Sequence, residues 1–412
     1  MGSSSEDTLK RFAEHLQTLL SWQMRLSNCV LKYNRFFEIP GELSDLSGQR
    51  KRVLEVLQAI GNCKLDQLIF DDVPGAELLS SAEWDSFFSS LLSRQSSLRI
   101  IDLACTSTLY NTVCAHVGVF LAKSSTLELL CFQLPLNIRS GTSMIPLCSA
   151  AVRALSEGLV QTKRLRELYV FRKEGAMADV LTSAFTGDVR NTSLEYLQLP
   201  GNLERLGIAL PVLLSSNNQN LKKIRLFLKW EDVTQGVVDD FRKVAESLRT
   251  RESSVVDASR KVLLQLICDT TAKFTEDDCR RAFSCLDSWA DAGERVPMLR
   301  TELRLNVQSP EQGNVKLGGD VKAWFLRAIN RYLHLKGLRV MLWWGEDAIM
   351  DMDHFHMLCE GIQSNQSVES LDIMYHGSKA SVDRKCWTHL LPLFAAQTAS
   401  ENATIRGYKC RR

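Results

Sequence analysis

The feature that most constrains this chain is a short phrase of apolar residues that recurs along it. Apolar side chains stand at its first, fourth and sixth positions, as in Leu98, Ile101 and Leu103. The first positions, polar only at Lys261 and Arg300, fall at intervals of 27 to 40 residues, at Leu65, Leu98, Leu127, Leu165, Leu194, Leu221, Lys261, Arg300, Leu338 and Val368. Repetition at such a period predicts a repeat protein whose neighbouring units stack on one another.

A stretch with helical spacing precedes most copies of the phrase. Residues ten and six positions before the first position share one helical face, as Phe88 and Leu92 do before Leu98. Small polar residues such as Gln95-Ser96-Ser97 lie in between and suit a tight turn. Each unit is therefore predicted to be a helix, a turn, a short strand and a loop. Because one unit cannot bury its own apolar side, the units should form one parallel sheet backed by helices.

The segment from Ser90 to Leu103 resembles the ribonuclease-inhibitor class of leucine-rich repeat, as do Asn191 to Leu199 and Asn365 to Ile373. The resemblance covers residues 62–375. It implies an α/β leucine-rich repeat solenoid, or horseshoe, with the parallel sheet on the concave face and the helices on the convex face. The family usually places an asparagine at the ninth position, and here only Asn202 conforms. We therefore expect the turns to be satisfied by other groups and the curvature to be irregular.

The apolar pattern divides the chain into three parts. Residues 1–61 are predicted to form an N-terminal helical cap, because apolar residues recur at helical spacing from Glu6 to Phe37. Residues 62–377 are predicted to form the solenoid of about ten irregular repeats, and residues 378–412 a C-terminal helix and polar tail. The longest repeats should carry extra loop or helix, with candidates at 231–257 and 310–321.

Composition favours a monomeric protein without nucleic-acid or membrane partners. The chain has 50 basic and 48 acidic residues, a net charge of +2, so no global field favours nucleic acid or a membrane surface. Its 12 cysteines form no C-x-x-C pair, which favours reduced thiols in the core over a disulfide or zinc framework. The polar N-terminus and the absence of a long apolar run predict a cytoplasmic or nuclear location.

The sequence contains none of the motifs that cradle phosphates, bind catalytic zinc or present a nucleophile. We therefore expect no enzymatic activity and no cofactor. One cluster has metal-ligand character: Asp351, Asp353, His354, His356 and Cys359. It fits the solvated side of a helix whose other side is apolar, so we expect no metal site.

The third, fifth and seventh positions of the phrase should face away from the helices, because side chains alternate along a strand. Tyr, Phe and Arg side chains, which often anchor protein interfaces, gather there over three neighbouring units. The alternative is that a loop inserted in the long repeats covers this wall, and Trp344 could likewise be a binding anchor or a covering residue. The predicted partner-binding residues are Glu167, Tyr169, Phe171, Tyr196, Gln198, Lys223, Arg225, Phe227, Arg304 and Trp344.

The favoured hypothesis is a non-catalytic intracellular scaffold that binds a protein partner on this wall. Two alternatives stay open. The repeat class includes activators of the Ran GTPase, so the resemblance also implies a regulator of a small GTPase. A substrate-recognition subunit of a ubiquitin ligase would need an adaptor-binding module at the N-terminus. Residues 39–43 faintly resemble the opening of an F-box, but the polar segment 48–52 follows where that motif has an apolar helix.

Overall fold

The chain forms two compact units of parallel strands alternating with helices, an arrangement compatible with a solenoid-like repeat. The first unit takes residues 1–198 with 215–221, and the second takes 199–214 with 222–412. The computed structural model describes residues 26–31, 50–51, 54, 57–58, 64–71, 79–104, 109–133, 145–186, 193–215, 220–251, 263–269, 275–293, 299–306, 332, 335–343, 367 and 370–376.

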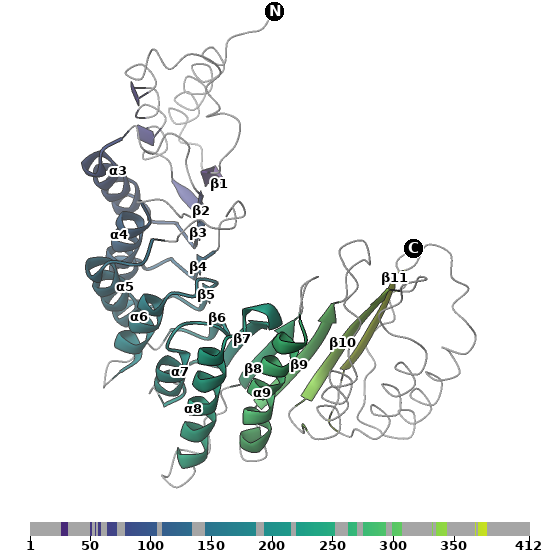
Figure 1. Cartoon of the computed structure of the whole chain (residues 1–412). Coiled ribbons are helices and arrows are strands. Elements are labelled where there is room, and N and C mark those ends of the chain that lie inside the picture. Colours follow the sequence, from purple (N-terminus) through teal and green to yellow (C-terminus); the bar gives the residue numbers. More distant parts are fainter. Residues whose placement is uncertain are drawn as a thin grey trace, which may run out of the picture. The chain divides into compact units, whose positions relative to one another are not determined.

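The strands of the first unit pair in parallel and in chain order. They are β1 (Leu26–Leu31), β2 (Leu65–Asp71), β3 (Ile100–Ala104), β4 (Leu129–Phe132), β5 (Glu167–Val170) and β6 (Tyr196–Pro200), whose last two residues belong to the second unit. The helices lie along one side of these strands (Figure 1) and are α3 (Ser81–Ser93), α4 (Leu109–Lys123), α5 (Ser149–Gln161) and α6 (Gly175–Phe185).

In the second unit the strands again pair in parallel and in chain order. They are β7 (Lys223–Lys229), β8 (Leu263–Asp269), β9 (Leu299–Asn306), β10 (Leu335–Trp343) and β11 (Ser370–His376). The helical elements are α7 (Leu206–Ser215), the 3-10 turn η3 (Trp230–Asp232), α8 (Gln235–Arg251) and α9 (Glu276–Gly293). Helices α8 and α9 pack side by side (Figure 1). Residues 231–257, where extra loop or helix was predicted, include part of η3 and α8, which is the one α-helix that the structure describes between β7 and β8, whereas the candidate at 310–321 lies outside the described residues.

Side chains alternate between a buried and a half-buried face along the strands. In β7, Ile224 and Leu226 are fully buried, whereas the neighbouring Arg225 and Phe227 are half-buried. The fourth position of the phrase is buried in every repeat from Leu68 to Leu303, and so is the sixth from Phe70 to Leu266. This confirms the predicted orientation of the strands, with apolar side chains turned toward the helices.

Serine and threonine hydroxyl groups join successive repeats by hydrogen bonds. The residue directly before a first-position leucine donates a hydrogen bond to a backbone carbonyl of the preceding repeat. Ser97 Oγ donates to Leu65 O at 3.0 Å, and Thr126 Oγ1 donates to Leu98 O at 2.9 Å. Each of these part-buried carbonyls would otherwise cost free energy if left unpaired.

A buried arginine fastens the loops at one end of the first unit. Arg172 follows β5 with a fully buried side chain, and its guanidinium lies 3.5 Å from the centre of the Tyr110 ring. Its Nε donates to Glu174, and its Nη2 donates to Ile145 O at 3.3 Å. Glu174 also accepts from the backbone N–H of Leu147 at 3.1 Å. Because a buried charge is tolerated only when it is paired and hydrogen-bonded, this cluster holds the chain between α4, α5 and α6.

Helices α4 and α5 approach each other through two glycines. A Cβ atom at Gly158 would lie inside van der Waals contact of the backbone oxygen of Gly118, and one at Gly118 would collide with the backbone of Ala154. No side chain fits at this crossing, so both glycines are required by close approach of the two helices.

At the N-terminal end of the repeat array, one prediction is wrong. The N-terminal cap was predicted to be helical through Phe37, but Leu26–Leu31 forms β1 and pairs with β2, so the sheet extends one strand further. An edge strand of this kind covers the open end of β2 as a helical cap would. The predicted C-terminal helix and tail at 378–412 lie outside the described residues.

The register departs from the predicted columns beyond β8. Leu264 pairs with Leu299 where the phrase predicts Leu303, a shift of four residues that keeps each side chain on its face. A bulge between Leu335 and Gly337 then shifts β10, so that Val340 pairs with Leu305 where Trp343 was predicted, a shift of three residues. An odd shift exchanges the two faces of a strand, so the predicted columns of β10 do not hold.

We predict that Gly158→Ala destabilises the protein by about 1–3 kcal/mol, because the added methyl group forces α4 and α5 apart. Gly236→Ala in α8 is the matched control. A Cβ there meets only Thr234 Oγ1 at 3.7 Å, so that variant should keep or slightly raise the free energy of unfolding. Urea unfolding curves of both variants measure the difference. Equal stability of the two would show that the glycine crossing is not needed.

Candidate functional site

The predicted partner-binding residues lie on the sheet face opposite the helices, and they fall in two units. The β5–β6 face comprises Glu167 and Tyr169 of β5, Phe171 just after it, and Tyr196 and Gln198 of β6. The β7–β9 face comprises Lys223, Arg225 and Phe227 of β7, Gln265 of β8, and Arg300, Glu302 and Arg304 of β9. Trp344 lies outside the described residues. The residues predicted to form one wall therefore fall in two units, and the face of each unit is described by itself.

On the β5–β6 face two tyrosines form a fixed aromatic pair. The ring centres of Tyr169 and Tyr196 are 5.2 Å apart at an interplanar angle of 42°. The Tyr169 hydroxyl donates to Glu167 Oε2 at 2.6 Å, and the Tyr196 hydroxyl donates to Gln198 Oε1 at 3.1 Å. Both rings are half-buried. Because the ring contact and the hydrogen bonds already hold both tyrosines in place, a ligand that packs on them costs little side-chain entropy.

Beside this pair, a polar group on β3 and β4 is held by hydrogen bonds. Gln133 Nε2 donates to Asp102 Oδ2 at 2.6 Å, and Cys131 is the register partner of Asp102. Burial, followed by the Asp102 carboxylate, raises the pKa of the Cys131 thiol to about 12. The thiol is therefore protonated at neutral pH, which makes it a weak nucleophile and a poor metal ligand.

The β7–β9 face carries a continuous hydrogen-bonded chain of side chains. Arg225 Nε donates to Gln265 Oε1 at 3.1 Å, and Gln265 Nε2 donates to Glu302 Oε1. The other oxygen of Glu302 accepts from Arg304 Nη2 at 3.0 Å. Cross-strand bonds of this kind fix long side chains that would otherwise be mobile, so the face presents its charges in a defined geometry.

The electrostatics of the β7–β9 face are dominated by cations. Burial, and then the charges of Arg225 and Arg300, lower the pKa of Lys223, whereas Glu302 acts in the opposite direction. Desolvation and nearby like charges both disfavour the protonated amine, so the lowered pKa of Lys223 fits a half-buried position among positive charges.

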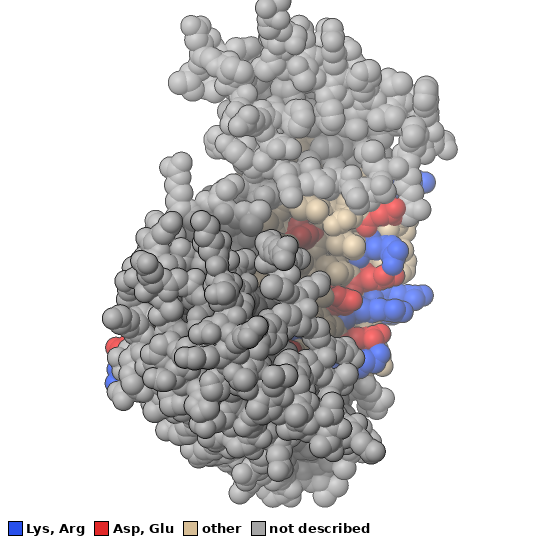
Figure 2. Space-filling model, turned by 90° about the vertical axis from the view of Figure 1, so that its right-hand side faces the viewer, with Lys and Arg blue, Asp and Glu red and all other residues tan. Residues whose placement is uncertain are grey.

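A different charge pattern runs along the entrances of the strands in the first unit. The second position of the phrase alternates in sign from Asp66 through Arg99, Glu128 and Arg166 to Glu195. Arg99 Nη2 lies 2.6 Å from Glu128 Oε2, and Arg166 Nε lies 3.9 Å from Glu195 Oε1. Figure 2 shows acidic and basic side chains alternating in such a band. Solvent screens these exposed pairs, so they contribute little to stability, and their charges cancel along the band.

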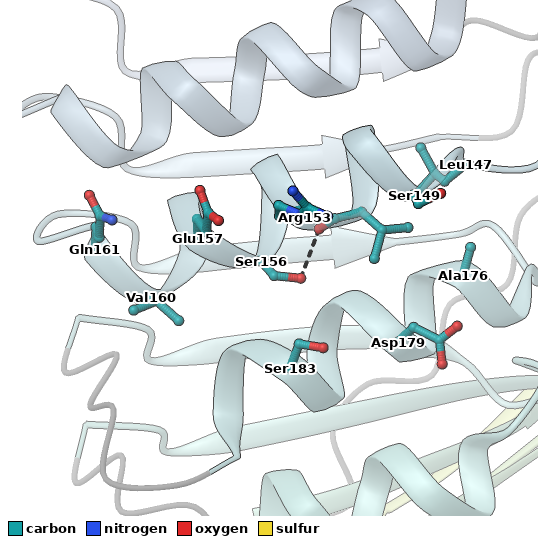
Figure 3. Close-up of a pocket in the computed structure, with 11 residues that line it drawn as sticks. Leu147, Ser149, Arg153, Ser156, Glu157, Val160, Gln161, Ala176, Asp179 and Ser183 are labelled. Carbon is teal, nitrogen blue, oxygen red and sulfur yellow. Dashed lines mark hydrogen bonds between the residues drawn. The ribbon is translucent and has the colours of Figure 1, made fainter.

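A second surface feature lies on the helix side, as an open groove of about 650 Å³ between α5 and α6. Arg153 and Glu157 of α5 and Asp179 and Ser183 of α6 line it (Figure 3). Its buried hydroxyl, Ser156 Oγ, donates to Val152 O of its own helix at 2.8 Å. Both acidic and basic side chains line the groove, and the Ser156 hydroxyl is already hydrogen-bonded within its own helix. We therefore do not place the partner site there.

The described part of the chain contains no group of three or more His, Cys, Asp or Glu residues that could hold a metal ion. The cluster from Asp351 to Cys359 lies outside it. Among the described helices, none is long and apolar enough to cross a membrane.

Comparison with models of known protein families finds no match, and comparison with curated proteins finds none either. The class that the structure defines is a repeating α/β protein with parallel strands and helices in alternation.

The structure brings together some of the predicted residues and adds others. It unites Tyr169 with Tyr196, and it links Arg225 to Arg304 through Gln265 and Glu302. Arg300 was assigned to the buried first position but is exposed, because the register shift of β9 places it opposite Gln265. Gln265 and Glu302 occupy outward positions of the phrase, but they were not among the predicted partner-binding residues, because their side-chain hydrogen bonds depend on the cross-strand register.

We predict that Asp102→Asn increases the rate at which Cys131 is alkylated by iodoacetamide at pH 8. The carboxylate raises the pKa of the thiol, so its removal increases the thiolate fraction. Mass spectrometry of proteolytic peptides follows the reaction at each cysteine, and the exposed Cys148 serves as an internal standard. An unchanged ratio of the Cys131 rate to the Cys148 rate would contradict this electrostatic account.

Proposed function

We propose that this chain is a non-catalytic interaction protein that binds a protein partner on the sheet faces opposite its helices. We also propose that its repeats are degenerate leucine-rich repeats of the ribonuclease-inhibitor-like class, and that it acts inside the cell. The buried leucine columns and the parallel strands alternating with helices support this assignment. The residues proposed to contact the partner are Glu167, Tyr169, Phe171, Tyr196, Gln198, Lys223, Arg225, Phe227, Arg304 and Trp344.

The observation that carries the proposal is the ordered aromatic pair of the β5–β6 face. Tyr169 and Tyr196 are in ring contact, hydrogen-bonded and half-buried on the sheet. Rigid tyrosines offer a large contact area at low entropic cost, which is why such residues dominate binding energy at interfaces. Arg225 of the β7–β9 face is held by Gln265 in the same manner.

Site-specific photo-crosslinking tests where the partner binds. A photoreactive phenylalanine analogue at Phe171 or Phe227 should capture the same partner in cells. The analogue at Val119 or Ile208, which are 51% and 56% exposed on α4 and α7, should capture it at background level. The analogue at Ser183 tests the groove between α5 and α6. Capture from the helix positions or the groove alone would overturn the proposal.

Once the captured partner is purified, the contribution of the anchor side chains to its binding affinity can be measured. Tyr169→Ala combined with Arg225→Ala should weaken binding of the purified partner by about tenfold or more, since two anchor side chains are lost. Both residues are half-buried, so the melting temperature should change little. Val119→Ala with Ile208→Ala is the control, and it should bind as the parent protein does. Unchanged affinity of the first variant would remove Tyr169 and Arg225 from the site.

A further inference from the structure

The β7–β9 face carries a local excess of positive charge. Asp269 is the register partner of Arg304, and the other described carboxylate near the cations Lys223, Arg225, Arg300 and Arg304 is Glu302. That carboxylate is already bonded by Gln265 and Arg304. Lys229 and Asp269, which pair in register at the far end, are of opposite charge and leave the excess unchanged.

This excess is specific to the face and does not reflect the whole chain. The net charge of the protein is only +2. The outward positions of β2 to β6 hold three acids, Asp71, Asp102 and Glu167, and no Lys or Arg. The band at the strand entrances alternates in sign. The cations are therefore concentrated on one sheet face of one unit.

We propose that the β7–β9 face binds an acidic peptide segment, and that such a segment is part of the partner. This inference rests on the proposed function and names the chemistry of the ligand. Lys223 and Arg225 are two residues apart on β7, and Arg300 is aligned with Arg225 across Gln265, about two strand spacings or 10 Å away. These charges repel one another, and carboxylates placed over them relieve that repulsion. The lowered pKa of Lys223 is consistent with such repulsion.

An apolar residue among the cations, Phe227, favours a peptide over a nucleic acid. Phe227 and Ile267 are register partners one row beyond Arg225 and Gln265, and Glu302 completes this row on β9. Phe227 is half-buried and Ile267 is 3% exposed. Acidic residues on either side of an apolar one fit this order of rows. A phosphodiester backbone carries a charge at every nucleotide, so it would place some of its charge close to Glu302.

The test is fluorescence anisotropy of the full chain with a labelled peptide of alternating glutamate and glycine around a central leucine. The parent protein should bind it, and binding should weaken at least tenfold from 50 to 200 mM salt. The same peptide with lysine in place of glutamate, and an oligothymidylate of equal charge, should bind at least tenfold more weakly. No binding of the glutamate peptide, or tighter binding of either competitor, overturns the proposal.

Charge variants locate the binding. Lys223→Gln with Arg225→Gln should weaken the glutamate peptide at least tenfold. Arg99→Gln with Arg166→Gln removes the same charge from exposed positions of the first unit and should change affinity less than twofold. Glu302→Gln should tighten binding two- to fivefold, which an unfolded variant could not do. Equal losses in the two double variants, or no gain with Glu302→Gln, overturn the proposal.

The two proposals fail in different ways. If the partner is crosslinked at Phe227 but the glutamate peptide does not bind, the interaction function stands and the acidic ligand is wrong. If the peptide binds as predicted but no partner is crosslinked at Phe171 or Phe227, the charge selectivity stands and the proposed function is wrong.

Discussion

The rest of the structure depends on one constraint, the burial of two apolar columns from each strand beneath the helices. Each fully buried leucine contributes about 1.5–3 kcal/mol, and the columns repeat from Leu68 to Leu303. Because side chains alternate along a strand, burying one set turns the other set to the opposite face. That opposite face is free to vary in chemistry, which is why it holds tyrosines and carboxylates in one unit and arginines in the other.

The repeats are joined by polar groups that differ from one repeat to the next. Serine and threonine hydroxyls bond the carbonyls of preceding repeats near Ser97 and Thr126, and the buried Arg172 holds the loop around Ile145. Arg172 is stable in this place only because Glu174, Ile145 and the Tyr110 ring compensate for its desolvation. Such local solutions permit repeats of unequal length.

Sequence periodicity predicted the helices, the strand faces and the buried columns from β2 to β8, because apolar burial dominates there. It failed where backbone geometry decides, at β1, at the shifted register of β9 and at the bulge of β10. The partners of Gln265 and Glu302 could not be predicted, since they depend on that register and on rotamers. The alternating charges from Asp66 to Glu195 were visible in the sequence, and aligning the second position of the phrase would have revealed them.

In the proposed function, the aromatic anchors lie in the first unit and the charge-selective face lies in the second. The sheet faces, and not the helices, are proposed to contact the partner. Hydrogen–deuterium exchange of the complex tests this most directly. The account predicts added protection in peptides from β5, β6 and the β7–β9 face, with α4, α5 and α8 unchanged. Protection confined to the helices would contradict it.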